Sequence, residues 1–203
     1  NLGILRESRS QKVAESFAAL PAEIRVHARS PELLSITKST SRSTVHRPGY
    51  LDSIAIKSFD SDGHVTGEHR FLGLFTSTAY STKPADVPLL RTKTARVLQR
   101  ARLKPGSHAA KALVNILDTY PRDELFQIND DELLSTATEI LHLGDRQRLR
   151  LFVRRDTFER FVSCLIYAPR ENYTTDLRIR WQDILVDSLN GLSAEFNVSL
   201  TES

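Results

Sequence analysis

The spacing of apolar residues divides the chain into a strand-rich part, a helical part and a second strand-rich part. Between about residues 33 and 80, apolar and polar positions alternate, which is typical of strands with one buried face. The predicted strands lie in LLSITKST, YLDSIAIKSF and EHRFLGLFTSTAY. Asp62 and Gly63 lie between the last two strands. Because glycine adopts positive φ easily, this pair predicts a hairpin turn and antiparallel pairing.

Helical spacing replaces this alternation in the middle of the chain. Of three predicted helices, the second is capped by Ser107 and ends at Pro121, and the third opens with a capping box at Asn129 and ends at Gly144. A run over residues 5–20 predicts a short amphipathic helix ahead of the first strand.

The strand pattern returns at residue 147. RLRLFVRR and RFVSCLIYA flank Asp156 and Thr157, which predicts a second hairpin. A helix is expected to begin at Thr175 or Asp176, and EFNVSL near the end of the chain predicts one more strand, cut short. The resulting order β–β–α–β indicates a sandwich with a helix on one sheet face, so the expected fold class is α+β.

Composition and charge narrow the possible classes of protein. The chain has 203 residues, of which 40% are hydrophobic and 26% charged, as in ordinary globular proteins. A net charge of +3 gives only a weak attraction to polyanions. The single cysteine, Cys164, indicates a reducing compartment, and no apolar run approaches the roughly 20 residues that span a bilayer. We therefore expect a cytoplasmic protein without a membrane partner, and the absence of methionine indicates a piece of a longer chain.

A search for chemical motifs predicts no catalytic, cofactor-binding or metal-binding residues in this segment. Neither G-x-G-x-x-G nor a Walker A pattern occurs, so NAD and ATP are not expected to bind in those ways. DSDG at residues 60–63 resembles the start of a calcium loop, but the later ligands are missing, and a hairpin turn is the favoured interpretation. The histidines show no zinc spacing, and Cys164 fits a small buried hydrophobe.

Residues 41–50, SRSTVHRPGY, form the densest polar cluster. Arg42, His46 and Arg47 offer hydrogen-bond donors beside a Pro-Gly turn. A solvated loop between strands is the favoured interpretation, with a contact to another domain or a bound ligand as the alternatives.

The stretch LFVRRDTFERFVS gives the best case for a nucleic-acid-binding module, because it combines three phenylalanines with three arginines. Packing of the phenylalanines in the core is favoured over this alternative, since Asp156 and Glu159 would interrupt a positive groove. Nucleic acid is therefore an improbable partner.

Five stretches together resemble the N-terminal half of the large-subunit bacterial NAD-specific glutamate dehydrogenases. They are STVHRPGYLDSIAIKSFD, GEHRFLGLFTSTAYS, PLLRTKTARVLQRA, GSHAAKALVNILDTYPRDELFQI and LFVRRDTFERFVSCLIYAPRENYTTDLR. The resemblance implies ACT-like and PAS-like modules, joined by helical linkers, ahead of a catalytic dehydrogenase domain in a homo-oligomeric enzyme. It divides the chain into a lead-in helix and linker (1–32), an antiparallel PAS-like β unit (33–86), a helical segment (87–146) and an incomplete ACT-like module (147–203).

The resemblance also implies a function. The parent enzyme would oxidise L-glutamate with NAD⁺, while the family's catalytic lysine, aspartate and dinucleotide motif lie downstream of this segment. We therefore expect a noncatalytic regulatory and oligomerisation segment whose partners are other domains and subunits of the same enzyme, with an amino-acid effector as a further possibility. Arg154, Arg155 and Arg170 are expected to meet acidic groups on a neighbouring module or subunit.

Overall fold

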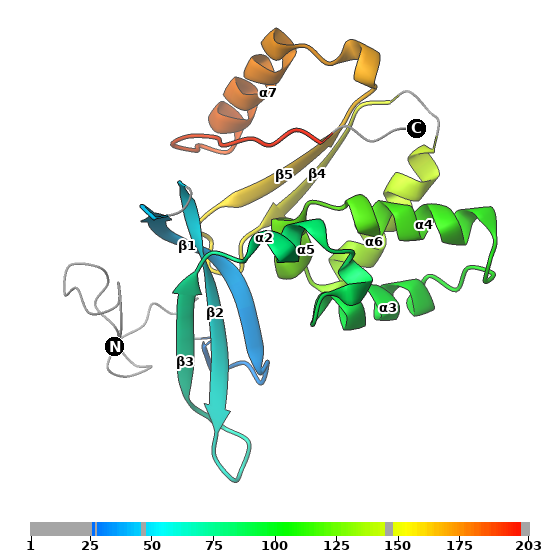
Figure 1. The fold of residues 1–203 in the computed structure, drawn as a ribbon. Helices are drawn as coiled ribbons and strands as arrows, with labels where there is room; N and C mark the ends of the chain where they lie inside the picture. Colours follow the sequence, from blue (N-terminus) through cyan, green and yellow to red (C-terminus); the bar gives the residue numbers. More distant parts are fainter. Residues whose placement is uncertain (1–25, 27, 46–47, 145–147, 200–203) are drawn as a thin grey trace. The chain divides into compact units, whose positions relative to one another are not determined.

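The computed structural model describes residues 26, 28–45, 48–144 and 148–199 (Figure 1). The chain forms two compact units. The first, called the sheet unit, draws on residues 1–95, 121–129 and 154–163. The second, called the helix unit, draws on residues 96–120, 130–153 and 164–203. The predicted lead-in helix at 5–20 lies outside the described residues.

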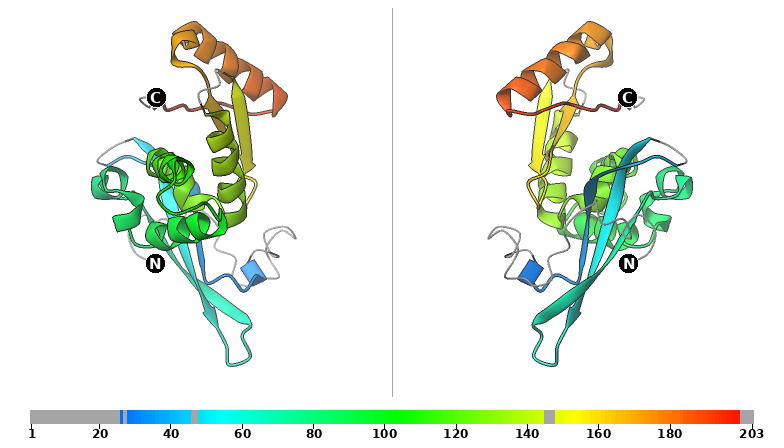
Figure 2. Two further views of the ribbon diagram at one scale, coloured as in Figure 1. Left: turned by 90° about the vertical axis from the view of Figure 1, so that its right-hand side faces the viewer. Right: turned by 90° about the vertical axis from the view of Figure 1, so that its left-hand side faces the viewer.

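A three-stranded antiparallel sheet forms the body of the sheet unit, as the alternating pattern predicts. Figure 2 shows this twisted sheet from two sides. Its strands are β1 (Leu34–Ser43), β2 (Gly49–Phe59) and β3 (Val65–Gly73), in the order β1-β2-β3. Gly63 has φ 82°, which confirms the predicted turn between β2 and β3.

The third predicted strand is shorter than expected. It ends at Gly73, and the remainder of the predicted strand includes α2 (Ser77–Ser81), followed by the 3-10 helix η3 (Pro84–Asp86). The backbone N–H of Phe75 donates to the Asp52 carboxylate at 3.2 Å, and the Tyr80 hydroxyl donates to Asp123 at 2.6 Å. The Asp52 carboxylate thus satisfies a backbone N–H that would otherwise need a strand partner.

A short helix that the sequence pattern did not predict lies against the sheet. It is α5 (Arg122–Gln127), and it contacts β1. Leu125 is fully buried, and the ring of Phe126 stacks on Phe75 with centroids 4.3 Å apart. The three consecutive residues 51–53 of β2 are buried, so the central strand is covered on both faces.

The helix bounds agree with the predicted caps. Three helices fill the middle of the chain: α3 (Leu90–Arg100), α4 (His108–Thr119) and α6 (Asp130–Leu143). Ser107 accepts a hydrogen bond from the N–H of Ala110 at the start of α4, and Gly144 after α6 has φ 46°. In the helix unit, α4 packs against α6. Their buried residues are Leu113, Leu117, Leu133, Ala137 and Ile140.

The last part of the chain begins with the predicted hairpin. Strands β4 (Arg150–Arg155) and β5 (Val162–Tyr167) form a two-stranded sheet, followed by the 3-10 helix η4 (Arg170–Asn172) and by α7 (Thr175–Ser188). Thr174 caps α7 by accepting from the N–H of Leu177.

The predicted final strand is not formed in the described residues 195–199. Gln182 of α7 donates to the carbonyl of Ala194 at 3.0 Å, and the Arg178 guanidinium lies 3.8 Å from the ring centroid of Phe196. The segment therefore follows α7 instead of pairing with a strand, and the expected order β–β–α–β is β–β–α here. The α+β class is confirmed. No helix among the described residues is long and apolar enough to cross a bilayer.

Candidate functional site

Charged and hydroxyl side chains cross-link the elements of the sheet unit in a set that we call the polar seam. Its members are Thr37 and Lys38 on β1, Asp52 on β2, Asp123 and Glu124 on α5, Arg154 on β4, and Asp156 and Arg160 in the turn that follows β4. Most of these side chains are buried or half-buried, so their charges depend on each other rather than on water.

Lys38 is the first junction of the polar seam. Its Nζ lies 2.6 Å from Oδ1 of Asp52, the residue directly opposite in the β1–β2 register, and 3.1 Å from Oδ1 of Asp123. One ammonium group thus joins two strands to α5. Two carboxylates share this cation, and the Tyr80 hydroxyl and the Phe75 N–H supply further donors to them.

The pKa of Asp52 is raised above its ordinary value, and burial is the main cause. The hydrogen bond and positive charge of Lys38 lower it, as does the N–H of Phe75, but they do not cancel the effect of burial. The negative charge of Asp123 adds to the increase. Burial therefore outweighs the stabilisation that Lys38 and Phe75 give to the charged form of Asp52.

Asp156 is the second junction. It is 3% exposed, and its carboxylate accepts from the Thr37 hydroxyl at 2.6 Å and from Nε of Arg160 at 3.1 Å. Nη2 of Arg160 also donates to the Thr37 oxygen at 2.9 Å, which closes a three-membered ring of hydrogen bonds. The ring fixes the β4–β5 turn to β1.

Arg154 and Lys93 hold the two ends of α5. The Arg154 guanidinium makes a forked ion pair with Glu124 in the first turn, with one branch at 2.9 Å. Lys93 donates to three backbone carbonyls at the C-terminal end of α5, where cationic side chains are favourable. These carbonyls belong to Leu125, Phe126 and Ile128, at 3.0, 3.2 and 2.6 Å.

This arrangement is suited to holding elements together rather than to catalysis. The carboxylates of Asp52 and Asp156 are almost fully buried, and each accepts hydrogen bonds from donors of the chain itself. A catalytic acid or base must come within hydrogen-bond distance of a substrate proton. The oxygens of these two carboxylates are instead engaged by donors of the chain itself. The chemistry open to the polar seam is a change of protonation or of partner.

The predicted site residues are dispersed. Arg42 on β1 stacks over the ring of its cross-strand neighbour Tyr50, at 4.7 Å from the centroid. His46 and Arg47 lie outside the described residues. Arg155 is exposed and lies 3.4 Å from Glu159, and Arg170 is exposed at the start of η4. Arg154 alone among them belongs to the polar seam.

Sequence reasoning missed every member of the polar seam except Arg154 as part of a site, namely Thr37, Lys38, Asp52, Asp123, Glu124, Asp156 and Arg160. The sequence held a weak indication of the polar seam. Lys38 and Asp52 are charged residues within predicted strands, at positions where the alternation does not decide between the buried and the exposed face. The acidic first turn of α5 after Pro121 was a second signal. Neither indicates which residues meet across the fold.

The aromatic residues of the second hairpin lie against side chains of this chain. Phe158 lies beneath Arg160 at 4.8 Å, and Phe161 lies 6.0 Å from Arg154. Phe152 meets Tyr167 edge to face at 6.1 Å, and burial raises the pKa of the Tyr167 hydroxyl. The arrangement gives no support to stacking of nucleic-acid bases on this hairpin.

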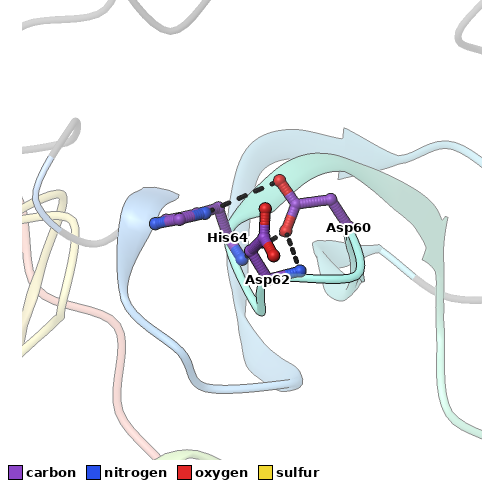
Figure 3. A group of neighbouring side chains, drawn as sticks. All are labelled: Asp60, Asp62 and His64. Atoms are coloured by element: carbon purple, nitrogen blue, oxygen red, sulfur yellow. Dashed lines mark hydrogen bonds and ion pairs between the residues drawn. The ribbon is translucent and has the colours of Figure 1, made fainter.

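Asp60, Asp62 and His64 gather at the β2–β3 turn (Figure 3). Their potential ligand atoms lie within 4.8 Å of one another, and all three residues are exposed. Oδ1 of Asp60 accepts from the N–H groups of Asp62 and His64 at 3.0 and 2.8 Å. These bonds are those of an aspartate-stabilised turn and account for the proximity of the three residues.

The fold and the polar seam define an α+β protein in which ion pairs join a sheet, a helix and a hairpin. Comparison with known proteins identifies its relatives. The model of "Glutamate dehydrogenase, helical motif 1" matches residues 87–146, and that of "Glutamate dehydrogenase, ACT2 domain" matches residues 150–203. No solved structure shows significant similarity to the chain.

Three proteins named NAD-specific glutamate dehydrogenase are similar over most of the chain. The protein of Halomonas elongata is 46% identical over 85% of the chain, that of Pseudomonas aeruginosa 41% over 87%, and that of Mycobacterium tuberculosis 35% over 85%. The matched regions make up 11%, 11% and 10% of those proteins. The chain is thus a segment of the NAD-specific glutamate dehydrogenase family, as its resemblance predicted, and spans about a tenth of its relatives' length.

Proposed function

We propose that this chain is a noncatalytic regulatory and oligomerisation segment of an NAD-dependent glutamate dehydrogenase. The observation that carries the proposal is the match, in chain order, to a glutamate dehydrogenase helical motif and an ACT2 domain. The sequence also lacks the glycine-rich motifs of nucleotide sites. The parent enzyme would convert L-glutamate, NAD⁺ and water into 2-oxoglutarate, ammonium and NADH, in the cytoplasm, and NAD would bind elsewhere in the polypeptide.

The proposed modules follow the four-part division made from the sequence. Residues 33–86 would form the PAS-like β unit, 87–146 the helical segment and 147–203 the first part of the ACT-like module, after a lead-in at 1–32. The buried polar seam supports a role in transmitting structural change, because displacement of one element breaks ion pairs held by the others.

Partners of the segment would be other domains and subunits of the same enzyme. Arg42, His46, Arg47, Arg155 and Arg170 remain candidates for these contacts or for binding an effector, while Arg154 is engaged with Glu124. An amino acid is the proposed effector class, by analogy with ACT modules.

The proposal is tested by assaying glutamate-dependent NADH formation with the isolated chain, where no turnover is expected. A screen of the twenty amino acids for an increased melting temperature tests the effector, since a ligand that binds the folded state stabilises it. Turnover by the isolated chain would refute the noncatalytic role, and the absence of any melting shift would refute effector binding by this segment.

A further inference from the structure

Strand β3 is an open edge of the sheet. Among the described residues it pairs with β2 alone, so one row of its backbone N–H and C=O groups faces away from the sheet. Proteins usually protect such edges with prolines, bulges or charged side chains. The central residues of β3, Glu68 to Phe71, are all exposed and include no proline.

We propose that β3 pairs antiparallel with β3 of a second copy of this chain, about a two-fold axis at His69. Directly opposite residues in an antiparallel pair point to the same face of the sheet. A two-fold axis perpendicular to the sheet keeps each residue on the same face in both copies. The axis must therefore pass through a residue, because an axis between two residues would place side chains of opposite faces against each other. The charges of β3 decide which residue that is.

Opposite charges meet in only one of the three central registers. An axis at Glu68 places two glutamates opposite each other, and an axis at Arg70 places two arginines opposite each other. An axis at His69 places Glu68 of each copy opposite Arg70 of the other. Like charges at directly opposite positions are destabilising and opposite charges are stabilising, so β3 is self-complementary only about His69.

Gly67 supplies an independent observation for the same register. Its φ is not positive, and a Cβ built on it would meet nothing within 4 Å among the described residues. Neither backbone conformation nor packing within one copy therefore requires glycine here. An axis at His69 places Gly67 opposite Phe71 of the second copy, and Phe71 is 58% exposed in one copy. An aromatic side chain over a cross-strand glycine is a known stabilising arrangement.

Glu68 and Arg70 can exchange their pairing within one strand for pairing with the second copy at little cost in free energy. Glu68 and Arg70 form an ion pair along their own strand, and both are exposed. Lys57 of β2 lies directly opposite Glu68 and keeps this position when a second copy pairs. Such a surface pair contributes at most about 1 kcal/mol, so forming the same pair with the second copy costs little.

The paired strands are short for a protein interface. β3 has nine residues, fewer than the roughly 20–30 a side found in stable interfaces. We therefore expect a weak dimer that forms at high protein concentration.

This pairing would give the oligomerisation part of the proposed function a surface and a partner, and in that respect it rests on the proposed function. Sedimentation velocity of the 203-residue chain over a wide concentration range tests it. The wild type should dimerise with rising concentration, and Glu68→Arg and Arg70→Glu should each remain monomeric. An equimolar mixture of the two variants should dimerise again, because its opposing charges are complementary.

The double variant Glu68→Arg/Arg70→Glu should also dimerise, since exchanging the charges keeps the strand self-complementary. A wild type that stays monomeric, single variants that dimerise like the wild type, or a mixture that stays monomeric would each overturn the proposal. None of these results alters the assay of NADH formation, so failure of the pairing is distinguishable from failure of the proposed function.

Disulfide formation tests the register itself. Directly opposite residues have Cα atoms about 4.5–5.5 Å apart, within the range of a disulfide. In a Cys164→Ser background, His69→Cys should form a covalent dimer on mild oxidation much faster than Ser61→Cys, which places an exposed cysteine in the β2–β3 turn. Equal rates for the two variants would overturn the register.

Discussion

Lys38 and Asp52 lie directly opposite each other on β1 and β2, and the ammonium of Lys38 lies 2.6 Å from the Asp52 carboxylate. The same ammonium lies 3.1 Å from Asp123 on α5. The single side chain of Lys38 thus joins the sheet to a helix residue 85 positions further along the chain. Changes to this junction should therefore affect the sheet unit as a whole.

Replacing Lys38 with methionine keeps the length of the side chain and removes its charge. The buried Asp52 would then lie beside the half-exposed Asp123 without a cation, and loss of one partner of a buried pair costs about 3–5 kcal/mol. Lys38 is partly exposed, so we expect a loss near the lower end of this range. Urea titration followed by the NMR signals of β2 amides measures the free energy of unfolding of the sheet unit.

Arg155→Met is the matched control for Lys38→Met, because it removes a cation from an exposed ion pair. Exposed pairs contribute about 0–1 kcal/mol. Equal effects of the two substitutions would show that the Lys38 junction does not stabilise the sheet unit.

The raised pKa of Asp52 predicts how stability changes with pH. Between the ordinary aspartate pKa and the higher pKa of the folded state, the folded chain binds more protons than the unfolded chain. The contribution of Asp52 to the free energy of unfolding should therefore fall as pH rises through this window and then become constant. Urea titrations of wild type and Asp52→Asn at a series of pH values measure this difference. Wild-type stability that rises relative to Asp52→Asn as pH rises would contradict the assignment.

Replacing Thr37 with valine keeps the shape of the side chain and removes the hydroxyl. Asp156 then loses a donor and Arg160 loses an acceptor, so we expect a loss of about 1–3 kcal/mol. Thr40→Val on the same strand is the control, because Thr40 is exposed, and it should change stability by less than about 0.5 kcal/mol. Equal effects in the same urea titration would argue against the Asp156 junction.

Leu125 tests the docking of α5. Its side chain is fully buried, and truncation to alanine should cost about 2–5 kcal/mol because a cavity replaces it. Leu192→Ala is the control at a fully exposed leucine and should have little effect. Thermal unfolding followed by NMR signals of α5 and β1 compares the two, and an unchanged melting temperature for Leu125→Ala would show that α5 is not anchored there.

Most elements of the fold could be predicted from sequence signals that span only a few residues. Alternation and the Asp62-Gly63 turn predicted the β2–β3 hairpin, and Ser107 and Gly144 marked helix ends, because these preferences act within a few residues. The six-residue helix α5 escaped prediction because it is too short to show a period. Its stability comes from burial of Leu125 and from contacts distant in sequence.

The polar seam could not be predicted for a related reason. Pattern reading assigns charged residues to the surface, whereas Asp52 and Asp156 are buried by partners on other elements. The pairing of Asp156 with Thr37 spans 119 residues, and nothing local to either residue indicates the other. The predicted final strand fails for the opposite reason. Its apolar pattern is local, but the ring of Phe196 and the carbonyl of Ala194 just before it meet α7 instead.

We propose that the segment belongs to a glutamate dehydrogenase without performing its chemistry. Glutamate-dependent NADH formation, measured side by side for the isolated chain and for a full-length relative at equal molar concentration, tests it most directly. The relative should turn over while the isolated chain stays at the rate of the reaction without enzyme. Turnover by the isolated chain above that background would contradict the account.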